Sequence, residues 1–222
     1  MTAAETQAIR LARLRSAAAT LQLSLPERDA QRLLAYLDLL QRWNGTYNLT
    51  AVRDPNEMLV QHLFDCLAVI PPLQRTLAAV PHPRVLDVGS GGGLPGVVIA
   101  MLLPAVRVVC VDTVGKKAAF IRQAGVELQL PNLQAEHGRV ESLRAEPFDL
   151  ITSRAFASLA DFTRLTQRHL ANPGIWAAMK GKRPDDEIAA LPAEVTMFHV
   201  EPLHVPELNA ERCLVWMRRR PD

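Results

Sequence analysis

The chain has 222 residues, of which 49% are hydrophobic, enough to bury the core of one domain or of one domain with an appendage. Its formal net charge of +2 permits a basic face but excludes a uniformly basic protein. The three scattered cysteines indicate a reducing, cytoplasmic setting rather than a disulfide framework or a metal site, and no apolar run is long enough to predict a membrane span.

The N-terminal third is predicted to be helical. Residues 1–23, rich in alanine and arginine, faintly resemble a transit peptide, but a frayed or short helix is the preferred interpretation of this N-terminal extension. Ser24 and Glu27 have the spacing of a capping box ahead of a leucine-rich amphipathic stretch. Gly45 is expected to end that helix.

A second helix start follows. Residues 54–57 combine an aspartate cap, a proline in the first turn and an acid at the third position. The prolines at 71–72 are expected to end this helix. The sequence therefore predicts an N-terminal helical part over residues 24–72, followed by a second domain over residues 73–222.

Beyond residue 84 the pattern changes to alternating strands and helices. This alternation predicts an α/β fold with a Rossmann-like, mostly parallel sheet, and the two closely spaced last strands predict an antiparallel terminal edge. The expected strands are 84–88, 106–111, 133–138, 148–152, 175–179, 194–205 and 212–218, and the expected helices are 115–128 and 158–170, the latter ended by residues 172–174.

The most informative segment is the glycine-rich loop of residues 89–96, which joins a predicted strand to a helix. Glycines let a ligand approach the backbone, and a helix N-terminus offers free N–H groups, so the loop suits a nucleotide-like ligand. The loop also satisfies the dinucleotide pattern, but Asp87 places an acid where a pyrophosphate is disfavoured. An acid there suits the cationic end of S-adenosylmethionine, bound beside Gly89 and Gly91. Another nucleotide, or a purely structural turn, stays open.

Two further strand ends carry candidate cofactor contacts. Asp112 follows the second strand and can accept both ribose hydroxyls, although it could instead cap the next helix. Val140 and Glu141 follow the third strand. A backbone N–H and an acceptor there can meet an adenine ring, whereas Glu141 could also be a solvated helix-start acid.

The end of the fourth strand reads Ser-Arg-Ala-Phe over residues 153–156. Methyltransferases that attack exocyclic amines of bases usually carry an Asn/Asp-Pro-Pro-aromatic turn here, and those that attack C5 of a pyrimidine need a cysteine. Neither feature is present at a suitable strand end. A ring nitrogen such as N7 of guanine has a free lone pair and needs alignment rather than a base or a covalent intermediate.

Several short motifs together resemble one family. They are Trp43-Asn44, residues 47–50, residues 53–60, His62 with Asp65, residues 87–96, 115–117, 148–149, 153–159, 180–181 and 186–188. The chain from about residue 33 to residue 215 resembles the RsmG (GidB) family of bacterial 16S rRNA (guanine-N7)-methyltransferases. The first 18 or so residues have no clear match.

The resemblance implies methyl transfer from S-adenosylmethionine to N7 of a guanine in the 530 loop of 16S rRNA. The partner would be the small ribosomal subunit or its precursor, and we expect a monomer. The family pattern places cofactor contacts on Gly89, Leu94, Val140, Glu141 and Arg154. A methyltransferase for a small molecule or protein, and a non-enzymatic nucleotide-sensing module, stay as alternatives.

Arg154 and Phe156 are the candidate catalytic residues. Because N7 methylation makes the guanine ring cationic, a guanidinium against the ring would oppose the reaction, which favours the cofactor carboxylate, an rRNA phosphate or guanine O6 as the partner of Arg154. Phe156 could stack the target base or belong to the core. His62 and Asp65 could form a polar brace beside the site, and no general base is needed.

Basic side chains near the strand ends are candidates for RNA contact. The C-terminal arginines 218–220 are interpreted as a soluble tail. The RNA-binding candidates are Arg53, Lys116, Lys117, Arg122, Lys180, Lys182 and Arg183.

Overall fold

The computed structural model of the protein describes residues 2–154, 156 and 158–221. Its centre is a seven-stranded sheet in the order β3-β2-β1-β4-β5-β7-β6, in which β1 to β5 are parallel and β7 is antiparallel to both of its neighbours. This confirms the predicted mostly parallel sheet with an antiparallel edge. The strands are β1 (Arg84–Val88), β2 (Arg107–Asp112), β3 (Leu133–His137), β4 (Phe148–Ser153), β5 (Leu170–Lys180), β6 (Val195–Pro202) and β7 (Cys213–Arg219).

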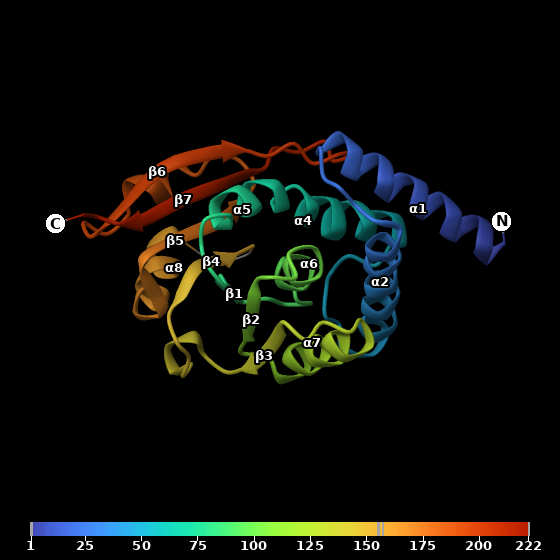
Figure 1. The fold of residues 1–222 in the computed structure, drawn as a ribbon, viewed down its shortest axis with the longest axis horizontal. Helices are drawn as coiled ribbons and strands as arrows, with labels where there is room; N and C mark the ends of the chain where they lie inside the picture. Colours follow the sequence, from blue (N-terminus) through green and yellow to red (C-terminus); the bar gives the residue numbers. More distant parts are fainter. Residues whose placement is uncertain (1, 155, 157, 222) are drawn as a thin grey trace.

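Helices cover both faces of the sheet, and the two termini lie at opposite ends of the long axis (Figure 1). Alternate residues of β1 belong to different cores: Val85 packs with α1 to α7 on one face, and Leu86 packs with α8 on the other. In the described ranges no helix is long and apolar enough to cross a membrane. The helices are α1 (Ala3–Thr20), α2 (Glu27–Tyr47), α3 (Pro55–Met58), η1 (Leu59–Phe64), α4 (Asp65–Leu67), α5 (Ile70–Leu77), α6 (Gly96–Leu102), α7 (Gly115–Glu127), η2 (Val140–Ser142), α8 (Leu159–Thr166), η3 (Gln167–His169) and α9 (Asp185–Ala189).

The N-terminal segment differs from the frayed or short helix expected there. α1 has 18 residues and begins with a capping box in which Thr2 and Glu5 exchange side-chain and backbone hydrogen bonds. Leu14 and Ala17 on this helix are buried in the core shared with α2 and the sheet. The buried apolar stripe, hidden in an alanine-rich composition, is what holds the helix in place.

Both predicted ends of α2 are wrong. The helix begins at Glu27 after Pro26, and no side chain caps it, so Ser24 is not its cap. Gly45 lies within the helix, which continues to Tyr47 and ends at Asn48 in the left-handed conformation. The rings of Trp43 and Tyr47, one turn apart with centroids separated by 5.1 Å, pack across the glycine and carry the helix past it.

The next helical segment starts as predicted. The Asp54 side chain accepts hydrogen bonds from the backbone N–H groups of Asn56 and Glu57. The prolines at 71–72 do not end the helical part, because they occupy the first turn of α5, where a missing N–H costs nothing. The helix that they were expected to end contains a π-helical stretch, η1, which the sequence did not indicate.

The segment between β4 and β5 also corrects a prediction. α8 is capped by Ser158, whose hydroxyl accepts from the N–H of Asp161, but it ends at Thr166 rather than near residue 170. The Asn-Pro-Gly sequence at 172–174 lies within β5, where the pairing with β4 shifts its register. β5 therefore starts earlier than predicted and carries an irregularity where a proline cannot donate a ladder hydrogen bond.

Candidate active site

The glycine-rich loop leaves β1 and enters α6 at the carboxyl end of the sheet. Gly89 has a φ of 67°, and a Cβ added there would meet nothing within 4 Å, so its backbone faces open space. Gly96 is needed for the opposite reason, because a Cβ there would lie 2.3 Å from the Sγ atom of Cys110. One glycine thus leaves room for a ligand, and the other lets α6 approach the sheet closely.

Asp87 lies beneath this loop and is completely buried. One carboxylate oxygen accepts a hydrogen bond from the N–H of Gly96 at 3.0 Å, and Oδ1 has no partner among the described residues. Burial raises the pKa of Asp87 from 3.8 to about 6. The carboxylate therefore anchors the start of α6 from below, which differs from a direct contact with a ligand in the cavity above.

Asp112, at the end of β2, bonds to the backbone of two neighbouring loops. Its Oδ1 accepts from the N–H of Val114 at the start of α7, and its Oδ2 accepts from the N–H of Gly91 at 2.9 Å. The N-cap of α7 is Val114, which has no side-chain cap, so Asp112 closes the turn before the helix and is not its cap. The same carboxylate ties the glycine loop to β2. Asp112 also lines a cavity of about 620 Å³ at the strand ends, so its remaining lone pairs can accept from a ligand.

We call this cavity the loop cavity. It brings together four of the eight predicted cofactor contacts, Gly89, Asp112, Val140 and Glu141. Gly91 does not line it and bonds to Asp112, Leu94 is buried in the core, and Asp87 lies below the loop. Phe156 lines the loop cavity, and its ring packs against Phe162 with centroids 5.6 Å apart. The residues that line it include Val88, Gly89, Asp112, Thr113, Lys117, Gly138, Val140, Glu141 and Phe156.

A second cavity of about 380 Å³ is lined by Arg154, the residue that directly follows β4. We call it the arginine cavity. Its centre is Asp65, whose two carboxylate oxygens lie 3.5 Å from the Arg154 guanidinium and 2.9 Å from Nε of Arg212. Arg154 therefore belongs to this cavity rather than to the loop cavity. The residues that line it are Gln61, His62, Asp65, Arg154, Met179, Lys180, Gly181, Leu203 and Arg212.

The π-helical segment η1 shapes one wall of the arginine cavity. The N–H of Asp65 donates to the carbonyl oxygens of Val60 and His62, and the Gln61 carbonyl accepts from Arg154 at 3.0 Å. This irregular turn thus supplies a backbone acceptor that fixes the guanidinium. π-Helical turns of this kind occur frequently at functional sites.

His62 lies in the same wall, but it is not bonded to Asp65. Its Nε2 lies 3.0 Å from the Thr50 hydroxyl, while its Nδ1 is buried without a partner among the described residues. Burial, followed by the nearby charge of Arg154, lowers the pKa of His62 from 6.5 to about 4. The imidazole is therefore neutral near pH 7, and the polar brace consists of two separate contacts rather than one pair.

Four of the seven predicted RNA-binding residues have a partner within the protein. Lys180 is not a free cation, because its Nζ lies 2.8 Å from the Glu187 carboxylate, and Arg122 donates to the Ala135 carbonyl. Arg53 donates to a side-chain amide, and Arg183 pairs with Asp185. The candidates that are exposed at the side chain are Arg53, Lys116, Arg122, Lys182 and Arg183.

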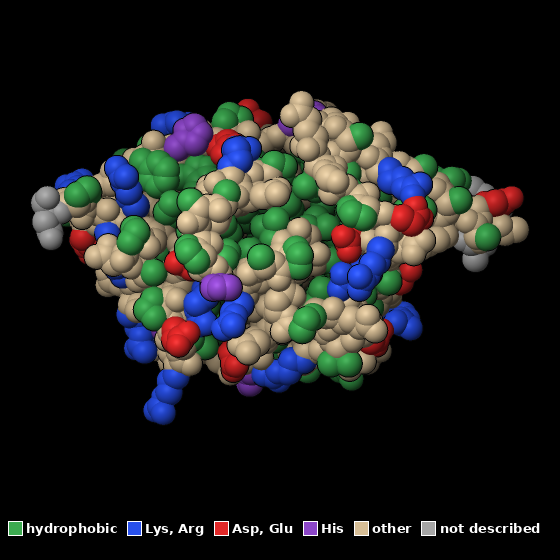
Figure 2. Space-filling model, in the orientation of Figure 1, with side chains coloured by type: hydrophobic (Ala, Val, Ile, Leu, Met, Phe, Trp, Pro, Cys, Tyr) green, Lys and Arg blue, Asp and Glu red, His purple; other side chains and the backbone are tan. Residues whose placement is uncertain are grey.

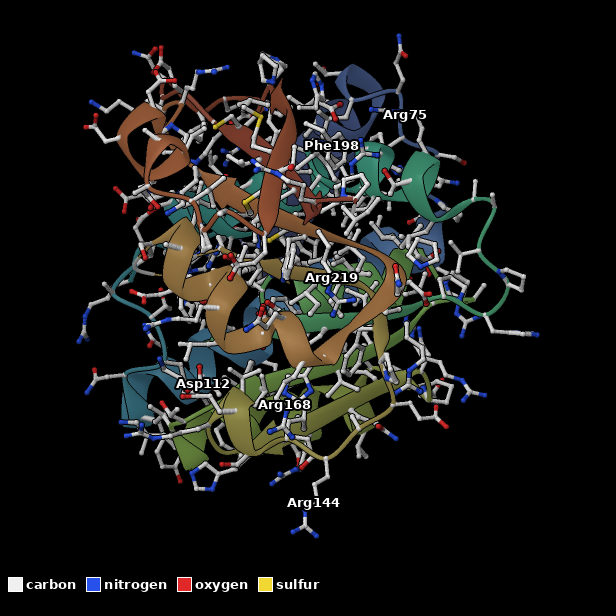
Figure 3. The ribbon with its side chains drawn as sticks, turned by 90° about the vertical axis from the view of Figure 1, so that its left-hand side faces the viewer. Arg75, Asp112, Arg144, Arg168, Phe198 and Arg219 are labelled. Carbon is white, nitrogen blue, oxygen red and sulfur yellow. The ribbon has the colours of Figure 1, made fainter. Side chains whose placement is uncertain are left out.

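The C-terminal arginines are not simply a soluble tail. Arg219 lies in β7 and donates to the carbonyl oxygens of Gln167, Leu170 and Ala171, where it closes the end of η3. Arg144 projects into solvent, whereas Arg219 lies against the body of the protein (Figure 3). Over the face in Figure 2, basic and acidic side chains are interspersed, in keeping with the small net charge.

Sequence reasoning missed two functional contacts. The Tyr36 hydroxyl donates to the Gly92 carbonyl at 2.6 Å and so fixes the glycine loop from α2. A tyrosine at a core position of a leucine-rich helix signals a buried hydroxyl that needs a partner. The Arg212 pairing with Asp65 had no such signal, because the two residues are far apart in the chain.

The sheet order, the antiparallel final pair and the loop cavity at the strand ends define the class I S-adenosylmethionine-dependent methyltransferase fold. Solved structures share it at low sequence identity. TrmN from Thermus thermophilus matches with a TM-score of 0.57 and 21% identity, over 73% of this chain and 53% of that one. The YcgJ protein from Bacillus subtilis matches with a TM-score of 0.53 and 15% identity, over 72% of this chain and 100% of that one.

The chain belongs to the GidB family, described as rRNA small subunit methyltransferase G, whose sequence model matches residues 29–215. It is 62% identical over 196 residues to a ribosomal RNA small subunit methyltransferase G of Leptothrix cholodnii, with 88% of this chain and 89% of the relative covered. It is 58% identical over 207 residues to the protein of that name in Methylibium petroleiphilum, with 93% of each chain covered.

Proposed function

We propose that the protein transfers a methyl group from S-adenosylmethionine to N7 of a guanine in the 530 loop of 16S rRNA. It would act in the cytoplasm as a monomer, on the small ribosomal subunit or its precursor. The observation that carries the proposal is the closeness of two cavities at the carboxyl ends of the strands: Arg154 lines one, and Phe156, two residues further along the chain, lines the other. One cavity suits a nucleoside cofactor, and the other is rich in hydrogen-bond donors.

The loop cavity fits the cofactor. Open space over Gly89 admits a ligand against the backbone, Asp112 offers acceptors to ribose hydroxyls, and Val140 and Glu141 lie where an adenine would be read. When bound, S-adenosylmethionine supplies a methyl group whose bond to sulfur breaks, with the electron pair left on sulfur, as the N7 lone pair forms the new bond. The residues around it hold and orient the reactants and exclude water.

The side chains at the site support a reaction without a protein nucleophile or base. The cysteines are buried, and burial raises the pKa of the Cys66 and Cys110 thiols, which disfavours a reactive thiolate. His62 is neutral, but N7 carries no proton that a base would have to remove. Alignment of a free ring-nitrogen lone pair is chemistry that this site can perform.

Single-turnover methylation of small-subunit particles tests the proposal. We expect labelled methyl transfer to the target guanine and none when that nucleotide is replaced by 7-deazaguanine, which has carbon in place of N7. Free ribonucleosides and total protein serve as parallel acceptors. Transfer to the deaza particle, or preferential labelling of protein or small molecules, would contradict the proposed function.

A further inference from the structure

The arginine cavity contains a polar arrangement that the methyl-transfer chemistry leaves unexplained. Asp65 is buried, and of the described residues that line the cavity it is the one acid. Arg154 and Arg212 hold it from two sides, while Met179 and Leu203 supply apolar walls. A buried ion network of this kind has a high desolvation cost, and its net contribution to stability is small. Its retention next to a ligand cavity points to recognition.

The network leaves capacity for further hydrogen bonds. A carboxylate has about four lone-pair positions, and the two arginine contacts of Asp65 use two of them. A guanidinium has five N–H donors in a fixed plane, and Nη1 of Arg154 serves both Asp65 and the Gln61 carbonyl. The cavity therefore presents acceptors directly beside donors.

This arrangement of acceptors beside donors is complementary to one edge of guanine. When N7 faces the methyl donor, the edge that carries N1–H and the 2-amino group points away from it, and O6 lies between that edge and N7. On this edge guanine has two neighbouring donors, N1–H and the 2-amino group, and one acceptor, O6. A protein site that pairs with all three needs a carboxylate beside a donor such as a guanidinium. Adenine has an acceptor at N1 and no 2-amino group, so it would leave buried groups unpaired.

We propose that Asp65 reads the target base by accepting hydrogen bonds from N1–H and the 2-amino group of guanine, while Arg154 donates to O6. This inference rests on the proposed function. The donor to O6 must lie close to the methyl donor, and Arg154 directly follows β4, two residues before Phe156, which lines the loop cavity. Arg212 positions the carboxylate from the far side.

The same contact assists the reaction. Methylation moves positive charge onto the guanine ring, and a carboxylate that faces N1–H interacts more strongly with the cationic ring than with the neutral one. Interactions that strengthen as charge develops raise the rate rather than only the affinity. Asp65 also offsets part of the positive charge of Arg154 and Arg212, which weakens the electrostatic objection to a guanidinium near the base.

The test compares guanine with inosine, which lacks only the 2-amino group, at the target position of reconstituted small-subunit particles. For the natural protein we expect kcat/KM to fall about tenfold to a hundredfold with inosine, because one charged hydrogen bond is lost. In Asp65→Asn, activity on guanine should fall and the guanine-to-inosine ratio should shrink to about threefold or less. Binding of S-adenosylmethionine, measured by calorimetry, should stay within about twofold.

Asp38→Asn is the matched control, because Asp38 also accepts from an arginine, Arg10, but lies away from both cavities. It should keep the ratio of the natural protein. Equal rates on guanine and inosine by the natural protein overturn the inference, even if Asp65→Asn fails to fold. An equal loss on both substrates in a folded Asp65→Asn also overturns it. Failure of the natural protein to methylate the guanine particle would instead defeat the proposed function.

Discussion

The two cavities at the strand ends are built in different ways. The loop cavity is formed by segments that directly follow β1, β2 and β3, and its geometry is fixed mainly by backbone groups bonded to Asp112 and Tyr36. The arginine cavity depends on side chains from η1 and from the end of β5, and on Arg154 after β4 and Arg212 before β7, which are joined through the buried carboxylate of Asp65 in α4. The loop cavity is thus formed by short segments next to the strand ends, whereas the arginine cavity needs contacts between residues that are far apart in the chain.

The largest expected effect comes from breaking the loop cavity. Gly89→Asp places a charged side chain in the open space over the loop, and we expect S-adenosylmethionine binding to be lost while the fold remains. Calorimetry on the folded variant measures this. Gly45→Asp is the control, since that exposed glycine also has nothing within 4 Å and lies in α2. Near-normal affinity in Gly89→Asp would show that the cofactor site is elsewhere.

Arg154→Ala tests where the boundary between the cavities lies. We expect the single-turnover rate to fall by about tenfold to a thousandfold, because the base loses its positioning. Since the guanidinium lines the arginine cavity, cofactor affinity should change by no more than a few-fold. Arg107→Ala, at the exposed start of β2, should leave both quantities unchanged. A large loss of cofactor affinity would instead place Arg154 on the cofactor, as the family resemblance implies.

Asp112→Ala should affect the cofactor rather than the base. Loss of a charged acceptor of ribose hydroxyls predicts a Kd for S-adenosylmethionine about one to two orders of magnitude higher. Because the same carboxylate accepts from Gly91 and Val114, unfolding free energy should also drop by about 1–2 kcal/mol. Titration calorimetry and urea unfolding separate the two effects. An unchanged Kd with lower stability would mean that Asp112 has only a structural role.

The contrast between the cavities also explains what the sequence could predict. Strand patterns and the glycine loop placed Asp112, Val140 and Glu141 at one edge, because parallel strands end on the same side of a sheet. The same reasoning could not pair Asp65 with Arg212 across the chain, because periodicity carries no information on distant contacts. Lys180 illustrates the same limit, since its position near the edge suggested RNA and its partner is Glu187.

Element ends were less predictable than element types, for local reasons. Gly45 and the prolines at 71–72 were interpreted by their usual preferences, but ring packing between Trp43 and Tyr47 continues one helix and the prolines begin another. The π-helical segment η1 has no sequence signature at all. Its role in fixing Arg154 emerges only when β4 lies beside it.

The smallest effects on activity are expected at two buried titratable groups, His62 beside the arginine cavity and Asp87 below the loop cavity. The same two groups should have the clearest effect on how stability depends on pH. Activity should show no titration from His62 between pH 6 and 9, because its pKa is about 4, and His62→Gln should lower the rate at most a few-fold. A well-folded His62→Gln protein without activity would overturn the proposal that the reaction needs no base.

The two groups affect stability in opposite directions over nearly the same pH range. For His62 the folded pKa of about 4 is below 6.5, so its contribution to the free energy of unfolding is complete above pH 6.5. This contribution, about 3 kcal/mol, is lost as the pH falls to 4. For Asp87 the folded pKa of about 6 exceeds 3.8, so stability falls by about 3 kcal/mol as the pH rises from 3.8 to 6. The two slopes nearly cancel in the natural protein. In urea unfolding, the stability of Asp87→Asn relative to the natural protein should rise as the pH increases from 4 to 6. The stability of His62→Gln relative to the natural protein should fall as the pH increases from 4 to 6.5. If the free energy of unfolding depends on pH in the same way in all three proteins, the pKa values of His62 and Asp87 are not shifted by burial.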